Sequence, residues 1–385
     1  MKKKELIILF VIVVAQFMCT SLWFAGNAAL PQLGLKLQLT NSDLAWMTSS
    51  VQLGFIVGTL TYAFWMIADR FNASSVFLIS AVLGALCNFL ITFQVDYFQI
   101  LVFRFFTGFF LAGIYPVGMK IASDHFEKGL GRAMSFLVGA LVLGTALPHL
   151  ITAVGASWKW ENVLYLTSCL TVFGGLSIKF FVGEGMYKKK GAQPKFAAIK
   201  AVFKDKAFSS AAFGYFGHMW ELYAFWAFVP TMLISSGHFH LDDQQAISFQ
   251  SFVVIGLGAV ACFVGGFLAD RIGIKKMAFI FLFSSGICCL LSPLAFELDR
   301  ELFFGFMIFW GLMVIGDSPL FSTLVAQNAV PEIKGTALTM VTCIGFALTI
   351  VTIQLLGFLI PIVDDKFVFL ALLPGPVFGL LFLKR

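Results

Sequence analysis

Long apolar runs separated by short polar segments dominate this chain. A membrane-spanning helix needs about 20 apolar residues in a row, and twelve runs meet that requirement. We predict helices at residues 6–30, 44–67, 75–95, 98–122, 130–153, 160–182, 207–234, 246–269, 274–294, 301–326, 335–361 and 365–383. The runs are continuous rather than alternating, which excludes a barrel built from membrane strands. The predicted fold class is therefore all-α integral membrane, with twelve transmembrane helices.

Composition supports lipid as the solvent of this chain. Of its 385 residues, 59% are hydrophobic and only 12% are charged, about half the charged share of a soluble domain. The net charge of +6 comes from basic residues gathered between apolar runs, which argues against nucleic acid as a partner. All seven cysteines fall inside apolar runs without metal-ligand spacing. We expect them to be small core residues, and we expect no metal site.

The distribution of Lys and Arg predicts the orientation. With both termini in the cytoplasm, 21 of the 26 basic residues lie in cytoplasmic segments. The opposite loops hold only Lys36, Lys159, Arg300 and Lys366. Because cytoplasmic loops carry the excess of positive charge, we predict a multi-pass protein of the inner (plasma) membrane with both termini cytoplasmic.

The two halves of the sequence repeat one another at an offset of 201 to 204 residues. Three matches occur in the same order: Ala68-Asp69-Arg70 with Ala269-Asp270-Arg271, Gly108, Gly113 and Pro116 with Gly311, Gly316 and Pro319, and Gly131-Arg132-Ala133 with Gly335-Thr336-Ala337. This predicts two pseudo-symmetric six-helix bundles, residues 1–182 and 207–385, joined by a cytoplasmic linker at 183–206. Parallel repeats of this kind are typical of transporters that bind solute between their halves.

One segment of the repeat resembles a known family. Residues 266–276, Gly-Phe-Leu-Ala-Asp-Arg-Ile-Gly-Ile-Lys-Lys, resemble the loop signature of the major facilitator superfamily, and Arg104-Phe-Phe-Thr-Gly108 is similar to an element of its fourth helix. The N-terminal copy of the loop signature departs from the family, with Trp65 and Asn72 at its glycine positions. The antiporter signature of the fifth helix is not cleanly present. The resemblance implies the major facilitator fold.

The resemblance also implies a gating role for two acidic-basic pairs, Asp69 with Arg70 and Asp270 with Arg271. A carboxylate at the cytoplasmic end of a helix can bond to a neighbouring helix end, and that bond breaks when the halves move. The alternative is that these pairs only anchor the helices at the membrane interface.

Five ionisable residues should lie at membrane depth: Arg104, His149, His218, Glu221 and Asp317. A charge there costs about 2.5–3.5 kcal/mol on the insertion scale, so each needs a partner or water. Carboxylates in such a place suit proton coupling because desolvation favours protonation. We predict proton coupling by Glu221, Asp317 and His218, the last sharing a helix face with Glu221. The alternative is that these groups form permanent structural hydrogen bonds.

We predict that Arg104 and His149 contact substrate, together with aromatic and amide residues of the first, fourth, seventh and eighth helices. These additional candidates are Trp23, Asn27, Tyr115, Trp220, Tyr223 and Gln250. The alternative for Arg104 is an ion pair with an acid of the C-terminal half. Aromatic residues of membrane proteins also face lipid, so that alternative stands beside the binding role.

The sequence favours a secondary active transporter over an enzyme. It has no phosphate-binding Gly-rich loop, nucleophile elbow or paired catalytic carboxylates. We therefore expect no cofactor, a proton gradient as energy source, and a monomer that alternates access by a rocker-switch motion. Arg104 favours a small organic anion or zwitterion as substrate. The alternative is efflux of drugs or toxic compounds by proton antiport, which the buried acids with aromatic neighbours would suit.

Overall fold

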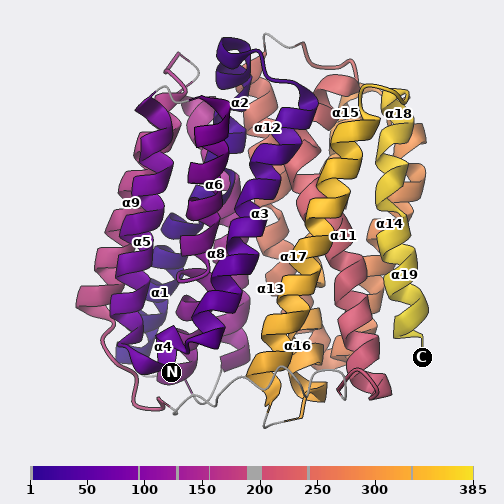
Figure 1. Cartoon of the computed structure of the whole chain (residues 1–385). Helices are drawn as coiled ribbons and strands as arrows, with labels where there is room; N and C mark the ends of the chain where they lie inside the picture. Colours follow the sequence, from indigo (N-terminus) through magenta and orange to yellow (C-terminus); the bar gives the residue numbers. More distant parts are fainter. Residues whose placement is uncertain are drawn as a thin grey trace. The chain divides into compact units, whose positions relative to one another are not determined.

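The computed structural model describes residues 3–93, 96–126, 130–155, 157–188, 202–240, 243–330 and 333–384. Within these ranges every regular element is a helix (Figure 1). The chain divides into two compact units, Met1–Leu39 with Ser50–Gln193, and Thr40–Ser49 with Pro194–Arg385. The predicted linker at 183–206 stays a prediction, because its residues 189–201 lie outside the described parts.

The N-terminal half of the chain forms the following elements: α1 (Lys3–Thr20), α2 (Leu22–Leu37), α3 (Asn41–Phe64), α4 (Ile67–Arg70), α5 (Ala73–Leu90), η1 (Ile91–Phe93), α6 (Tyr97–Leu111), α7 (Tyr115–His125), α8 (Leu130–Val154) and α9 (Glu161–Phe181). The C-terminal half forms α11 (Lys206–Ser235), α12 (Gln244–Gly256), α13 (Gly258–Ile272), α14 (Ile274–Ala295), α15 (Arg300–Gly316), α16 (Ser318–Asn328), α17 (Lys334–Leu359), α18 (Asp365–Val368), η4 (Phe369–Leu372) and α19 (Pro374–Leu383).

In the described residues, eleven helical stretches are long and apolar enough to cross a membrane: Glu5–Ala29, Ser42–Phe64, Ala73–Phe93, Tyr97–His125, Ala133–Val154, Glu161–Phe181, Gln244–Ile272, Ile274–Ala295, Arg300–Asn328, Lys334–Leu359 and Asp365–Leu383. The twelfth predicted span is α11, whose 30 residues include His218 and Glu221. α11 is less hydrophobic than these eleven stretches because it carries ionisable residues, and most of its side chains are buried. The predicted all-helical membrane fold is confirmed.

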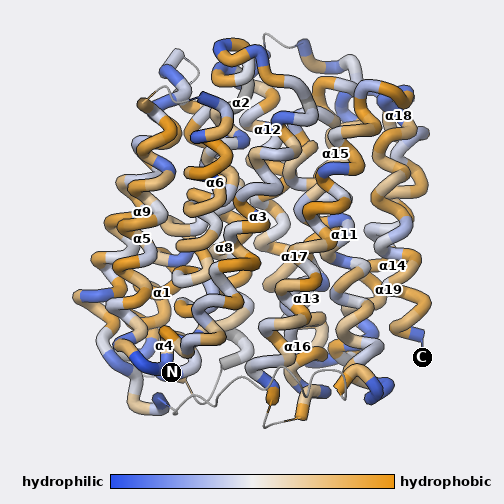
Figure 2. The backbone as a smooth tube through the Cα atoms, in the orientation of Figure 1, coloured by the Kyte–Doolittle hydropathy of each residue, from blue (hydrophilic) through white to orange (hydrophobic). Residues whose placement is uncertain are grey.

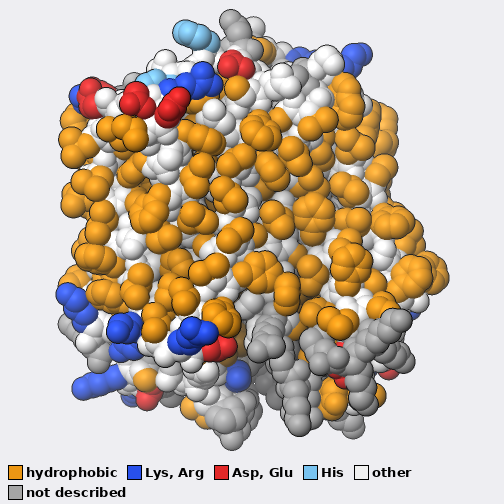
Figure 3. Space-filling view, turned by 180° about the vertical axis from the view of Figure 1, so that it is seen from behind, with side chains coloured by type: hydrophobic (Ala, Val, Ile, Leu, Met, Phe, Trp, Pro, Cys, Tyr) orange, Lys and Arg blue, Asp and Glu red, His pale blue; other side chains and the backbone are white. Residues whose placement is uncertain are grey.

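Polar residues lie mainly at the ends of the helices. Figure 2 shows the hydrophilic positions concentrated there, and on the face drawn in Figure 3 hydrophobic side chains cover the middle while charged ones gather at the two ends. Several helices begin at an Asp whose carboxylate accepts a backbone N–H of the first turn. Asp205 accepts from Phe208 at 2.8 Å, and Asp96 accepts from Gln99 at 2.9 Å. These caps satisfy N–H groups that a helix start leaves unpaired.

The repeated Gly-Pro motif produces matched breaks in the two halves. α6 ends at Leu111 and α7 resumes at Tyr115, just before Pro116. α15 ends at Gly316 and α16 resumes at Ser318, just before Pro319. Proline lacks an N–H and crowds the preceding turn, so a helix bends or breaks there. The residue at the second break is Asp317, which places a carboxylate at membrane depth on interrupted backbone.

The glycines of the same motif allow close helix contact. A Cβ at Gly108 would meet the carbonyl oxygen of Val51 closer than 3.0 Å, and a Cβ at Gly311 would meet that of Val254 in the same way. Both pairs lie at the 203-residue offset of the motif. The internal repeat is therefore reproduced in three dimensions, as equivalent backbone contacts within the two halves.

Candidate functional site

Glu221 lies in a cradle of hydrogen-bond donors inside the second unit. It projects from α11 and is 1% exposed. Its Oε1 atom accepts a hydrogen bond from Trp310 Nε1 of α15 at 2.6 Å. Ser285 Oγ and Cys289 Sγ of α14 donate to the same oxygen, the thiol at 3.3 Å. Ser285 and Cys289 are four residues apart, so they share one helix face.

His218 and Asp317 form a second buried group in the same unit. His218 Nδ1 lies 2.8 Å from Asp317 Oδ1, and each side chain is 1% exposed. Neither carboxylate oxygen of Asp317 accepts a hydrogen bond of ordinary geometry from the described residues, and His218 Nε2 has no partner there either. The rings of Tyr215 and Phe321 flank the imidazole, each with its centroid 6.0 Å away. The structure thus buries all three residues predicted for proton coupling in the second unit and places two of them, His218 and Asp317, in direct contact.

These two groups place two buried acidic side chains in the second unit. The repeat places Ile114 and Ser21 at the positions equivalent to Asp317 and Glu221, at offsets of 203 and 200. The first unit therefore carries no acid at the matching positions. Packing alone would not require two buried carboxyl groups in one half, since a buried charge is costly unless it is paired.

Arg104 is the buried cation of the first unit. It projects from α6 and is fully buried. Its Nη1 donates to Leu22 O at 3.0 Å and its Nη2 to Trp23 O at 2.5 Å, where the first span is interrupted between α1 and α2. A Cβ at Gly26 would lie 2.9 Å from Arg104 Nε, so only glycine leaves room for the guanidinium. Among the described residues it forms no ion pair.

The predicted contacts of the first unit lie in different surroundings. Trp23 is buried and donates to Gln52 Oε1 at 3.3 Å. Asn27 follows one turn later on α2 and is half-buried, as is Tyr115 at the start of α7. His149 of α8 is 3% exposed, and its Nε2 has no hydrogen-bond partner among the described residues. Each of these roles in substrate binding stays a prediction.

The predicted contacts of the second unit differ in how their polar atoms are used. Trp220 donates to Ala371 O of η4 at 3.0 Å, a bond within the bundle. Tyr223 is buried with its ring centroid 5.0 Å from that of Phe346. Gln250 of α12 is half-buried, and its Oε1 accepts no hydrogen bond from described residues. Trp220 thus already uses its indole N–H within the bundle, whereas Gln250 keeps an amide oxygen without a described hydrogen-bond partner.

The two predicted gating pairs differ. Asp69 at the end of α4 forms an ion pair with Lys120 of α7 at 3.0 Å, and Lys120 also lies 3.5 Å from Asp124. Its copy Asp270 is exposed and forms no ion pair with the described residues. The N-terminal copy, which departs from the family signature, is thus the one that holds an ion pair inside its own bundle.

The basic partners of these pairs are on the surface. Arg70 and Arg271 are exposed. The Cζ atom of Arg271 lies 4.8 Å from the centroid of the Phe267 ring on the same helix, a cation–π contact. Neither arginine forms an ion pair with the described residues, so their gating role stays a prediction.

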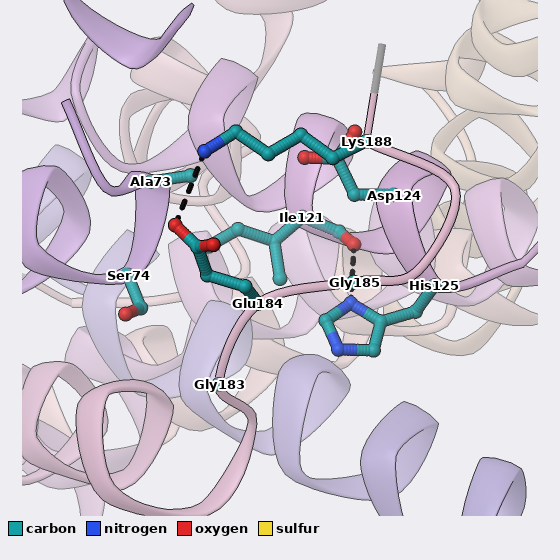
Figure 4. A pocket seen from close by; sticks show the side chains of 9 residues that line it. All are labelled: Ala73, Ser74, Ile121, Asp124, His125, Gly183, Glu184, Gly185 and Lys188. Atoms are coloured by element: carbon teal, nitrogen blue, oxygen red, sulfur yellow. Dashed lines mark hydrogen bonds and ion pairs between the residues drawn. The ribbon is translucent and has the colours of Figure 1, made fainter. Parts of the chain in front are cut away.

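The segment after α9 folds back against α5 and α7 at the same end of the first unit. Glu184 accepts from Asn72 at 2.9 Å and pairs with Lys188 at 3.1 Å, and Figure 4 shows this pair at the rim of a small pocket. The hydrogen bond and charge of Lys188 lower the pKa of the Glu184 carboxyl. His125 bridges α7 and α9, with Nδ1 2.9 Å from Ile121 O and Nε2 3.1 Å from Val182 O.

Sequence reasoning missed the donors around Glu221. It assigned the cysteines to the core in general, and five are buried, including Cys289. The assignment is wrong for Cys169, which is exposed, and Cys87 is half-buried. A membrane helix is apolar on its outer face too, so an apolar run does not tell which face a cysteine occupies. The four-residue spacing of Ser285 and Cys289 was the one signal that a polar face existed there.

Comparison with known proteins decides the family. The family model described as Major Facilitator Superfamily matches residues 12–353. The chain belongs to this superfamily. The superfamily assignment makes it a solute transporter rather than an enzyme.

The relatives are themselves described as transporters. The nitrite extrusion protein of Bacillus subtilis is 27% identical over 289 residues, 73% of this chain and 69% of that protein. The benzoate transport protein of Acinetobacter baylyi is 22% identical over 357 residues, 81% of this chain and 74% of that protein.

Solved structures support the fold. The nucleoside transporter NupG superposes with a TM-score of 0.75 at 15% identity, over 98% of this chain and 99% of that one. A bacterial homologue of the human lysosomal transporter Spinster gives a TM-score of 0.73 at 12% identity, over 100% of this chain and 96% of that one.

Proposed function

We propose that this superfamily member is a proton-coupled secondary transporter of a small organic anion in the inner membrane, working by alternating access. The observation that carries the proposal is the buried group of His218, Asp317 and Glu221 in the second unit. Imidazole and desolvated carboxyl groups change protonation near neutral pH. An acid that gains and loses a proton at membrane depth is what coupling to a proton gradient requires.

The choice of an anion rests on Arg104 and on the relatives. Its guanidinium is fully buried, bonded only to backbone carbonyls of Leu22 and Trp23, and forms no ion pair with the described residues. A buried positive charge without a carboxylate favours an anion nearby, since charges in low dielectric interact strongly. Two relatives are described as moving nitrite and benzoate. Both solutes are small monovalent anions with oxygen acceptors.

The test is uptake into proteoliposomes with an acidic exterior. Labelled benzoate is the first probe and nitrite the second, and vesicles without protein set the baseline because benzoic acid crosses lipid unaided. We expect accumulation above the baseline that a protonophore abolishes. Arg104→Gln should raise the KM for the anion about tenfold or more, the effect of losing one close charge interaction.

A cationic lipophilic dye is the contrasting probe. Efflux of the dye driven by an inward proton gradient, with no anion flux above the baseline, would overturn the anion assignment in favour of drug antiport. Absence of any proton-dependent flux for all three probes, in protein shown to be folded by a monodisperse elution profile, would overturn proton coupling of this solute class. Leu53, exposed on α3, supplies the matched surface control as Leu53→Ala.

A further inference from the structure

We propose that His218 and Asp317 take up and release the transported proton, while Glu221 stays ionised throughout the cycle. This inference rests on the proposed function and specifies which group of the acidic cluster carries the proton. The two carboxyl groups are equally buried, at 1% exposure. They differ in the partners that surround them, and that difference assigns the roles.

Glu221 has the surroundings of a permanent carboxylate. Three donors converge on its Oε1 atom, from Trp310, Ser285 and Cys289. An indole N–H can only donate, and its 2.6 Å distance to Oε1 is shorter than an ordinary N–H···O hydrogen bond, as is typical of a charged acceptor. Several hydrogen bonds donated to a carboxylate favour its ionised form. We therefore assign Ser285, Cys289 and Trp310 as positioning residues that keep Glu221 charged and fixed.

Asp317 has the surroundings of a group that exchanges a proton. Its close partner is His218 Nδ1 at 2.8 Å, and no indole, hydroxyl or thiol of the described residues donates to it. The partner side chain is an imidazole, which can accept or donate a proton. One added proton converts a carboxylate with a neutral imidazole, net charge −1, into a neutral pair, and its release reverses the change. The negative charge of Glu221 in the same bundle favours that uptake.

The other titratable groups around the pair do not compete for the proton. Cys262 of α13 donates its thiol to Ile315 O at 3.7 Å, beside the break at Asp317. Cys288 is buried next to Cys289, and the phenol of Tyr215 flanks the imidazole of His218. Thiols and phenols remain protonated near neutral pH. Apart from Glu221 and Asp317, the Asp, Glu, Lys and Arg residues of α11 and of the helices around this pair lie at helix ends: Lys206, Asp270, Arg271, Lys275, Lys276, Arg300, Glu301, Lys334 and Lys384.

Asp317 and Glu221 also differ in the backbone that carries them, because the helix is interrupted between α15 and α16. Asp317 occupies the break itself, next to Pro319, whereas Glu221 lies within the long helix α11. Backbone at a proline break lacks one helical hydrogen bond and bends more readily than a continuous helix. The proton-exchanging carboxyl is thus at a break in the backbone, whereas Glu221 lies inside a helix that continues to Ser235.

The first experiment separates coupling from transport. Reconstituted wild type, Asp317→Asn and Glu221→Gln are compared for accumulation driven by a pH gradient and for exchange of labelled against unlabelled anion without a gradient. Under the pH gradient, we expect Asp317→Asn to accumulate at least about tenfold less anion than wild type, the effect of one pKa unit or more. It should still exchange labelled for unlabelled anion. Glu221→Gln should keep its response to the gradient. The reverse pattern would overturn the inference and leave the proposed function standing.

The second experiment tests the role of the hydrogen-bond donors around Glu221 by measuring transport as a function of pH. Trp310→Phe removes the indole N–H but keeps an aromatic ring against Phe225. Loss of one hydrogen bond to a charged group raises proton affinity about tenfold. The acid limb of the transport profile should therefore move up by about one pH unit, because Glu221 now takes up a proton within the measured range. Trp160→Phe, another buried indole, is the matched control and should leave the profile in place.

Infrared spectroscopy tests the same assignment without any transport. At neutral pH the difference spectrum of wild type minus Glu221→Gln should lack the C=O band of a protonated carboxyl group, since the proposed state of Glu221 is ionised. Such a band in this difference spectrum would overturn the inference, whereas a band common to both proteins would come from another carboxyl group. A Trp310→Phe profile identical to that of Trp160→Phe would also overturn the positioning role. If wild type shows no proton-coupled flux while the infrared result is as expected, the proposed function fails and the assignment of charge to Glu221 does not.

Discussion

A single methyl group added at Gly311 should separate two helices that the repeat motif brings together. A Cβ at this position would meet the carbonyl oxygen of Val254 closer than 3.0 Å, whereas ordinary van der Waals contact begins at 3.4 Å. The obstacle is backbone, so it cannot rotate away. α12 and α15 must move apart by at least a few tenths of an ångström. Overpacking of this kind costs about 1–3 kcal/mol.

Gly305 on the same helix provides the control, because a Cβ there would meet nothing within 4 Å. Gly→Ala raises helix propensity by about 1 kcal/mol at either position, so this contribution cancels between the two variants. We expect Gly311→Ala to be less stable than Gly305→Ala by about 1–3 kcal/mol. That difference is about 5- to 150-fold in the ratio of folded to unfolded protein.

Thermal unfolding in detergent measures the difference. A maleimide dye that fluoresces on reaction reports exposure of the buried cysteines, among them Cys262 and Cys289, which are 0% exposed. Gly108→Ala should behave like Gly311→Ala, since its Cβ meets the Val51 carbonyl in the same way. An unfolding midpoint of Gly311→Ala at or above that of Gly305→Ala would refute the close backbone contact.

Two further predictions concern the charged end of the first unit. Asp69→Asn should weaken the anchoring of α4 on α7 by less than about 1 kcal/mol, the usual range for a partly exposed ion pair. A double-mutant cycle of unfolding midpoints with Lys120→Met, which leaves no like-charge pair beside Asp124, isolates this coupling. Glu184 has a lowered pKa in the folded protein because of Lys188. Its stabilising effect is therefore present above the pKa of the unfolded chain and is lost as pH falls through the lower folded value. Proteolysis near Tyr187 should accelerate in that acidic window in the wild type, and the same acceleration in Glu184→Gln would contradict the explanation.

The sequence by itself determined the membrane class, the spans and the internal repeat. These features follow from runs of about 20 residues and from loop charge, both of which are local. The match extends to individual contacts, since the offset between Gly108 and Gly311 also relates Val51 to Val254. The scarcity of charge at membrane depth singled out Arg104, His218, Glu221 and Asp317, because a charge there is retained only at a cost.

Only the tertiary structure decided which partners surround each of these groups. Glu221 accepts from residues 64 to 89 positions away, and Arg104 donates to carbonyls 81 and 82 positions away. No local pattern reports such partners, because they come from other helices through packing. The protonation behaviour of a buried carboxyl depends on how many donors face it. Two acids that look alike in the sequence therefore have different surroundings, one held by three donors and one paired with a histidine at a break in its helix.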